Sequence, residues 1–96
     1  MAIQSFATPE LKAFFKTGKV PKRAQWQSIA KIVARKLDIL DYAHVLADLK
    51  SPTGNHLEAL GKNLKGLHSI RVNDQWRIVF EWNNQGPEQV RIVDYH

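Results

Sequence analysis

Hydrophobic positions follow two different periods along the chain, and the change comes near residue 55. Before it, apolar residues recur at steps of three or four, as in the series Trp26, Ile29, Val33, Leu37 and Leu40. After it, apolar and polar residues alternate. Because a helix repeats about every 3.6 residues and a strand every 2, the pattern predicts helices followed by strands.

The first half divides into a short β-prone start at residues 3–6 and three predicted helices. Thr8 is an N-cap candidate, Pro9 suits the first helical position, and Gly18 is a natural stop. Pro21 is predicted to open a longer helix that runs to residue 40 with the apolar series inward. A short helical stretch at 44–49 and a loop at 51–55 follow.

The second half predicts strands at 57–60, 67–72, 75–82 and 89–95, with a turn at 83–87. Short connections between strands favour antiparallel pairing. The sequence therefore predicts an α+β fold, in which two to three N-terminal helices pack on one face of a mainly antiparallel sheet. All 96 residues are expected to form a single domain.

Strand parity fixes the expected register of the central hairpin. A loop of odd length at 73–75 pairs Ile70 with Ile78 and keeps the apolar face intact, with Trp76 and Trp82 in the core. The same register sets Arg71 opposite Arg77 on the polar face, with Arg91 and Tyr95 pointing the same way. Like charges in that position repel, so an external anion could relieve them, or both side chains could splay into solvent.

Composition narrows the classes of function. There are no cysteines, which excludes disulfides, thiolate nucleophiles and cysteine-based zinc sites. No apolar run approaches the roughly 20 residues of a membrane span, and the N-terminus lacks secretory features, so a cytoplasmic protein is expected.

The net charge of +5 comes from the first fifty residues, which hold nine Lys/Arg and four Asp/Glu. Clustered cations favour an anionic partner, either nucleic acid or an acidic protein, although a solvated helix surface is equally consistent with this charge.

One long stretch of the second half resembles a known family. It is SPTGNHLEALGKNLKGLHSIRVNDQWRIVFEW, together with the terminal VDYH and the opening IQSF. These segments are similar to the HigB-type killer toxins of the RelE-like superfamily, across essentially the whole chain. The resemblance implies a small endoribonuclease of a type II toxin–antitoxin system, with a RelE-like fold, which cleaves mRNA on the translating ribosome without a metal or other cofactor.

The resemblance also implies a protein partner. This is a HigA-like antitoxin with a helix-turn-helix domain, through which the complex binds operator DNA and represses its own operon. The chain departs from the family pattern at 61–64, where Leu64 replaces an arginine, and at Glu58, where some relatives have a histidine. A catalytically weakened homologue that acts mainly as a co-repressor is therefore the alternative.

RNA cleavage without a metal needs a base for the 2′-hydroxyl proton, cations around the phosphorus and an acid for the leaving oxygen. His96 is the first candidate for acid or base because imidazole titrates near neutrality, and Tyr95 and Asp94 adjoin it. Arg71 and Arg77 would hold the phosphate. The candidate RNA-binding residues are Lys62, Lys65, His56 and Glu58.

The remaining histidines favour structural roles. His68 has inward parity and is expected to be a hydrogen-bonded residue at the edge of the core. A zinc site built from His56, His68 and His96 lacks paired ligand spacing, so no metal site is predicted.

Overall fold

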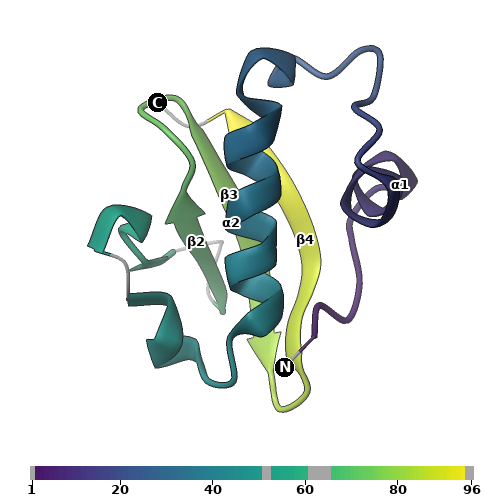
Figure 1. Cartoon of the computed structure of the whole chain (residues 1–96). Coiled ribbons are helices and arrows are strands. Elements are labelled where there is room, and N and C mark those ends of the chain that lie inside the picture. The colour runs from purple at the N-terminus through teal and green to yellow at the C-terminus, as the bar shows by residue number, and fades with distance from the viewer. Residues whose placement is uncertain (1, 51–52, 61–65, 95–96) are drawn as a thin grey trace.

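The chain folds into a four-stranded antiparallel sheet with helices on one side, as a computed structural model shows (Figure 1). The description covers residues 2–50, 53–60 and 66–94. The strands follow the order β1-β2-β3-β4, and α2 lies across one face of the sheet. The predicted α+β architecture is confirmed.

Helix α1 (Pro9–Thr17) begins and ends where the sequence predicts. The Thr8 hydroxyl accepts a hydrogen bond from the N–H of Leu11 at 3.2 Å, which satisfies one of the unpaired donors of the first turn. Gly18 ends the helix in the left-handed conformation, at φ 80°. Its N–H donates to the carbonyl of Phe14 at 2.8 Å.

The second helix is shorter than predicted. α2 (Ala30–Tyr42) follows a 3₁₀ turn, η1 (Gln27–Ile29), so the prediction that Pro21 opens the helix is wrong. The Gln27 amide donates to the carbonyls of Pro21 and Lys22, which satisfies them within a turn rather than within a helix. This turn sets the Trp26 indole edge-on to Phe14, with ring centroids 4.9 Å apart.

Two 3₁₀ elements connect α2 to the sheet, η2 (Leu46–Lys50) and η3 (Thr53–Asn55). η2 confirms the predicted helical stretch at 44–49, with its bounds shifted toward the C-terminus. The Asp48 carboxylate accepts hydrogen bonds from the N–H groups of His44 and Val45, at 2.9 and 3.2 Å. These two bonds lower the pKa of Asp48 because they stabilise its charged form.

The strands are β1 (Glu58–Ala59), β2 (Leu67–Arg71), β3 (Trp76–Asn83) and β4 (Gly86–Asp94). β4 begins at Gly86 instead of residue 89, so the turn after β3 is tighter than the predicted 83–87. The Asn83 side chain accepts from the N–H of Gln85 at 2.7 Å and that of Gly86 at 3.1 Å, which closes this turn.

The face of the sheet under α2 forms the core. Its strand residues alternate as predicted, and fully buried side chains from both layers meet there: Val33, Leu37, Leu40, Ile70, Ile78, Phe80 and Val90. We call the opposite face of the sheet the second face. By alternation and register it bears Glu58, Ser69, Arg71, Arg77, Val79, Arg91 and Val93.

The β-prone start of the chain lies along β4. Phe6 forms a parallel bridge with Val90, whose carbonyl accepts from the N–H of Ala7 at 2.9 Å. The β3–β4 register shifts beside this bridge, and Gln89 there has a φ of 53°. The N-terminal segment thus covers part of an edge that would otherwise expose unpaired backbone groups. None of the helices in the described ranges is long and apolar enough to cross a bilayer.

Gly18 and Gly54 form a matched pair for testing the α1 cap. A Cβ at either position would meet no atom within 4 Å, but only Gly18 has a positive φ. Gly18→Ala should therefore lower the free energy of unfolding by about 1–2 kcal/mol, through left-handed strain alone. Gly54→Ala should be neutral or stabilise the protein by up to about 1 kcal/mol. Urea unfolding curves of both variants provide the measurement, and equal effects would contradict this interpretation.

Candidate active site

The central hairpin has the predicted register. Ile70 pairs with Ile78 and Arg71 with Arg77, and the N–H of Val72 donates to the carbonyl of Trp76 at 2.9 Å. The turn between the strands is held by Asn73. Its side-chain oxygen accepts from the N–H groups of Gln75 and Trp76, each at 2.8 Å. Two arginines are therefore adjacent on the second face.

Arg77 is buried, at 7% exposed, so the alternative in which both arginines splay into solvent is wrong for this residue. Its Nε donates to the Ser69 hydroxyl at 2.8 Å, and Ser69 is itself fully buried. An Arg77 terminal nitrogen also donates to the backbone carbonyls of His56 and Ser69. Three acceptors, from Ser69 and His56, thus hold the guanidinium in one orientation.

Arg71 is the accessible member of the pair. Its side chain is 36% exposed and forms an ion pair with Asp74, which is 96% exposed. Arg71 turns toward Asp74 and Arg77 turns toward Ser69. Acceptors within the protein therefore reduce the repulsion between the two arginines, and no external anion is required to relieve it. An exposed ion pair of this kind contributes little to stability and can exchange its carboxylate for another anion.

The turn that precedes β1 anchors Arg77 from the other side. Asn55 is fully buried, and its amide donates to the Leu49 carbonyl at 3.1 Å. Its side-chain oxygen accepts from the Lys36 ammonium at 2.6 Å. The next residue, His56, has a φ of 44° and directs its carbonyl to Arg77. A buried amide thereby fixes the backbone that orients a functional candidate.

Lys36 is half-buried on α2, and its ammonium binds the Asn55 side chain instead of projecting into solvent. Burial lowers the pKa of its ammonium, and the positive charges of Arg35 and Arg71 lower it further. The same proximity that disfavours the Lys36 charge creates a positive potential at this edge of the sheet. Such a potential attracts a phosphate.

Of the other predicted site residues, Glu58 shares the face of the arginines and Asp94 does not. Glu58 is exposed and pairs with Ser69, so it shares the second face with the arginines. Asp94 pairs with Trp76, which by alternation directs it to the face under α2, and its carboxylate accepts from the Gln75 amide at 3.1 Å. Tyr95, His96, Lys62 and Lys65 lie outside the described residues.

His68 packs toward the core, as predicted, with its ring stacked on Phe80 at a centroid distance of 6.2 Å. Its Nδ1 is buried and has no hydrogen-bond partner among the described residues, so the expected hydrogen bond is not found there. Trp76 is buried and Trp82 packs edge-on to Phe80, which confirms both as core residues. No cluster of three His, Asp or Glu side chains suited to a metal occurs within the described ranges.

Three residues of the site were missed by sequence reasoning: Ser69, Asn55 and Lys36. Strand parity puts Ser69 on the face of Arg77, so the register alone could have identified it. Asn55 and Lys36 are 19 residues apart, and their contact depends on how η3 packs beside α2. No local sequence signal marks that contact.

Comparisons with known proteins agree with this fold. Residues 4–96 match a family described as RelE-like toxins of type II toxin–antitoxin systems, HigB. The chain is 53% identical over 55 residues to toxin HigB-1 of Vibrio cholerae, an alignment that covers 57% of this chain and 58% of that toxin. It is 33% identical over 81 residues to an uncharacterized protein of Haemophilus influenzae, covering 84% and 79% of the two chains.

A solved structure shows the same architecture. The YoeB dimer from Staphylococcus aureus matches 100% of this chain and 97% of its own, with a TM-score of 0.56 and 20% identity. That likeness shows the fold alone.

The burial of Arg77 gives a stability prediction that separates the two arginines. Arg77→Ala should lower the free energy of unfolding by about 2–3 kcal/mol, because it removes the donor that Ser69 and the His56 carbonyl bind in the folded protein. Arg71→Ala removes only an exposed ion pair and should cost less than about 1 kcal/mol. Chemical denaturation of the two variants tests this difference, and a neutral Arg77→Ala would contradict the structural role.

Proposed function

The chain belongs to the HigB family of RelE-like toxins of type II toxin–antitoxin systems, and we propose that it is a metal-independent endoribonuclease. Its substrate is mRNA on the translating ribosome in the cytoplasm, and its cleavage inhibits translation and growth. The observation that supports this most is the positive group formed by Arg71 and Arg77, which are paired on neighbouring strands.

The proposed reaction is transesterification within the RNA. The 2′-hydroxyl oxygen attacks the adjacent phosphorus, its proton passes to a general base, and the bond from phosphorus to the 5′ oxygen breaks. An acid protonates that 5′ oxygen, leaving a 2′,3′-cyclic phosphate. Negative charge grows on the phosphoryl oxygens during this step, so fixed guanidinium groups stabilise the transition state more than the substrate.

The two arginines have different parts in this proposal. Arg71 binds the phosphate directly, exchanging Asp74 for a phosphoryl oxygen, since it is exposed. Arg77 is a positioning residue and a fixed charge beside Arg71, since its guanidinium is already held by Ser69 and His56. Preorganised charge of this kind needs no reorganisation when the reaction occurs.

Proton transfer is assigned to the end of the chain. His96 is the proposed acid or base, and Tyr95 holds the nucleophile or stacks on a base. Asp94 ends β4 within reach of the hairpin turn, as its bond to Gln75 shows, and orients this segment. Glu58 and His56, with Lys62 and Lys65, are proposed to bind RNA on either side of the scissile phosphate.

A HigA-like helix-turn-helix antitoxin is the proposed protein partner, and operator DNA is bound only through it. The buried Arg77 favours one alternative, a catalytically weakened homologue that serves mainly as co-repressor, because its guanidinium is committed to internal acceptors. The two functions differ in whether the chain alone arrests growth.

Growth arrest after induced expression tests the phosphate site. Arg71→Ala should lower the rate of mRNA cleavage about a hundredfold and relieve the arrest, because charge stabilisation in the transition state is lost. Lys50→Ala removes an exposed cation on η2 and should remain fully toxic. Thermal melts of both variants confirm that they fold. A folded Arg71→Ala chain with full toxicity would overturn the assignment.

Deletion of His96 tests the proposed proton transfer. The truncated chain should lose growth arrest and mRNA cleavage while it still binds the antitoxin, since one terminal residue contributes little to the core. Cleavage assays and antitoxin titrations on the same preparation give both readouts. Cleavage at the parent rate would remove His96 from the mechanism.

A further inference from the structure

A surface cavity of about 590 Å³ lies between α1, the 21–26 turn and β4. Its floor is apolar and consists of buried or half-buried side chains: Leu11, Pro21, Ala24, Trp26 and Ile92. Lys22, Arg23 and Glu10 line its rim and are exposed. The cavity thus combines an apolar base with a charged margin.

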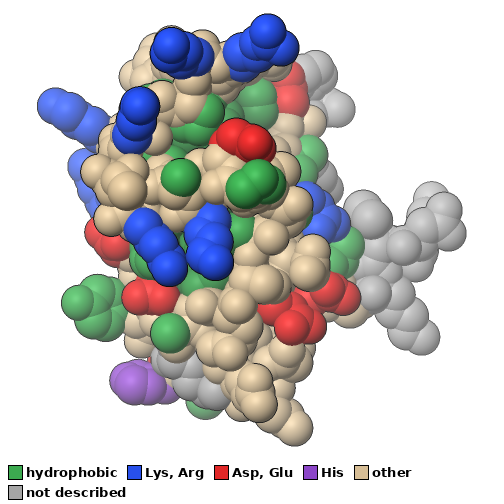
Figure 2. Space-filling model, turned by 90° about the vertical axis from the view of Figure 1, so that its right-hand side faces the viewer, with side chains coloured by type: hydrophobic (Ala, Val, Ile, Leu, Met, Phe, Trp, Pro, Cys, Tyr) green, Lys and Arg blue, Asp and Glu red, His purple; other side chains and the backbone are tan. Residues whose placement is uncertain are grey.

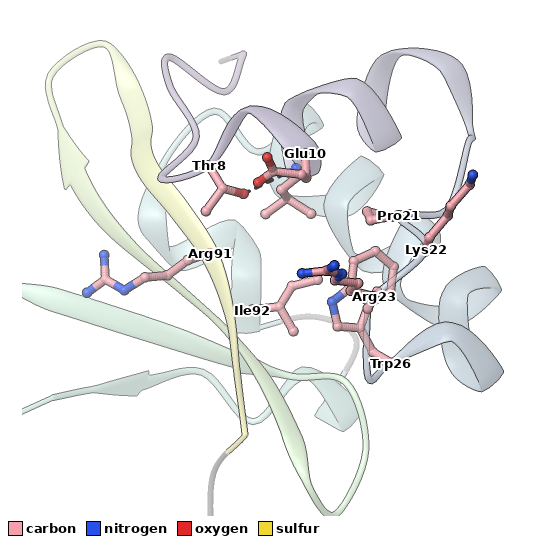
Figure 3. A pocket seen from close by; sticks show the side chains of 10 residues that line it. Thr8, Glu10, Pro21, Lys22, Arg23, Trp26, Arg91 and Ile92 are labelled. Atoms are coloured by element: carbon pink, nitrogen blue, oxygen red, sulfur yellow. Dashed lines mark hydrogen bonds between the residues drawn. The ribbon is translucent and has the colours of Figure 1, made fainter.

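Figure 3 shows how these side chains are arranged. Arg23 extends over the cavity beside Ile92, and Glu10 approaches from α1, whereas Lys22 points outward. Arg91 projects from the other side of β4, as strand alternation requires. The cavity therefore opens on the helix side of the sheet, and the arginine pair lies on the second face.

The surroundings of the cavity are strongly basic. Residues 1–37 contain eight Lys/Arg and a single acid, Glu10. Seven of these eight cations are exposed, and Lys36 is the half-buried exception. Figure 2 shows Lys and Arg side chains over this side of the molecule, with hydrophobic patches between them. A ligand with negative charge and one apolar anchor matches both properties.

We propose that this cavity is the docking site for an acidic amphipathic segment of the antitoxin. One apolar side chain of that segment enters the cavity against Leu11, Trp26 and Ile92, and flanking carboxylates meet Arg23 and Lys22. The proposal rests on the proposed function only for the identity of the partner. Docking here leaves the second face, and with it Arg71, uncovered.

A protein segment fits this cavity better than RNA does. RNA bases bind proteins chiefly by stacking on exposed aromatic faces and by contacts between phosphates and cations. Trp26 packs against Phe14 and is only 9% exposed, so little of its ring is available for a base to stack on. The apolar floor offers nothing to a phosphate, but it suits a buried aliphatic or aromatic anchor of the kind that dominates protein interfaces.

Binding of the purified helix-turn-helix antitoxin is measured for two matched charge variants of this chain. Lys22→Glu with Arg23→Glu reverses the rim, and Lys31→Glu with Arg35→Glu makes the same net charge change on α2. The rim variant should raise the Kd at least about tenfold, and the α2 variant should only slow association modestly. Equal losses in both would show diffuse attraction and overturn the cavity as the docking site.

Ala24→Phe tests the apolar anchor, because its ring would occupy the cavity. We expect weaker antitoxin binding with the salt dependence of the parent, since the rim charges remain, and growth arrest that the antitoxin no longer rescues. An unchanged Kd would overturn insertion of an anchor. If Ala24→Phe fails to fold in a thermal melt, the rim variant decides alone, since it changes only exposed side chains.

RNA cleavage is measured separately on the same variants. Cleavage lost in the rim variant with antitoxin binding intact would make this an RNA surface and overturn the proposal. A parent chain that binds the antitoxin as described but cleaves no RNA would remove the proposed nuclease function and leave the docking site standing.

Discussion

The register of the β2–β3 hairpin is the constraint on which the rest of the structure depends. Asn73 holds a turn of odd length, so Ile70 faces Ile78 beneath α2 while Arg71 faces Arg77 on the other side. A shift by one residue would exchange the two faces, bringing charges into the core and apolar side chains to the surface. The burial of the core and the pairing of the arginines are therefore two consequences of one turn.

Bringing Arg77 into the interior requires acceptors, because a buried guanidinium without partners is strongly destabilising. Ser69 supplies one from the neighbouring strand, and the carbonyl of His56 supplies another. The backbone at His56 is in the left-handed region, and buried Asn55 holds the turn by binding Lys36 and Leu49. Folding energy thus maintains a positive charge in a fixed orientation, while the neighbouring Arg71 stays accessible.

Much of this could be predicted from local signals in the sequence. The cap at Thr8, the stop at Gly18 and the alternation in β2 and β3 each depend on neighbouring residues, and the structure confirms them. The start of α2 was missed because Gln27 satisfies the carbonyls of a preceding turn, which no periodicity reveals. Burial of Arg77 was missed because it depends on Ser69 and on a turn 21 residues away in the chain.

The structure places a basic, partly apolar surface on the helix side of the sheet and a cationic group on the opposite face. With the proposed docking site and the proposed phosphate site, this division would place a protein partner and RNA on different surfaces. In the proposed mechanism, guanidinium groups and not a metal ion stabilise the negative charge that grows on the phosphate. The most direct test is the chemistry of the RNA ends after cleavage of ribosome-bound mRNA. Ends with a 2′,3′-cyclic phosphate and a 5′-hydroxyl are expected, whereas 3′-hydroxyl and 5′-phosphate ends would contradict this mechanism.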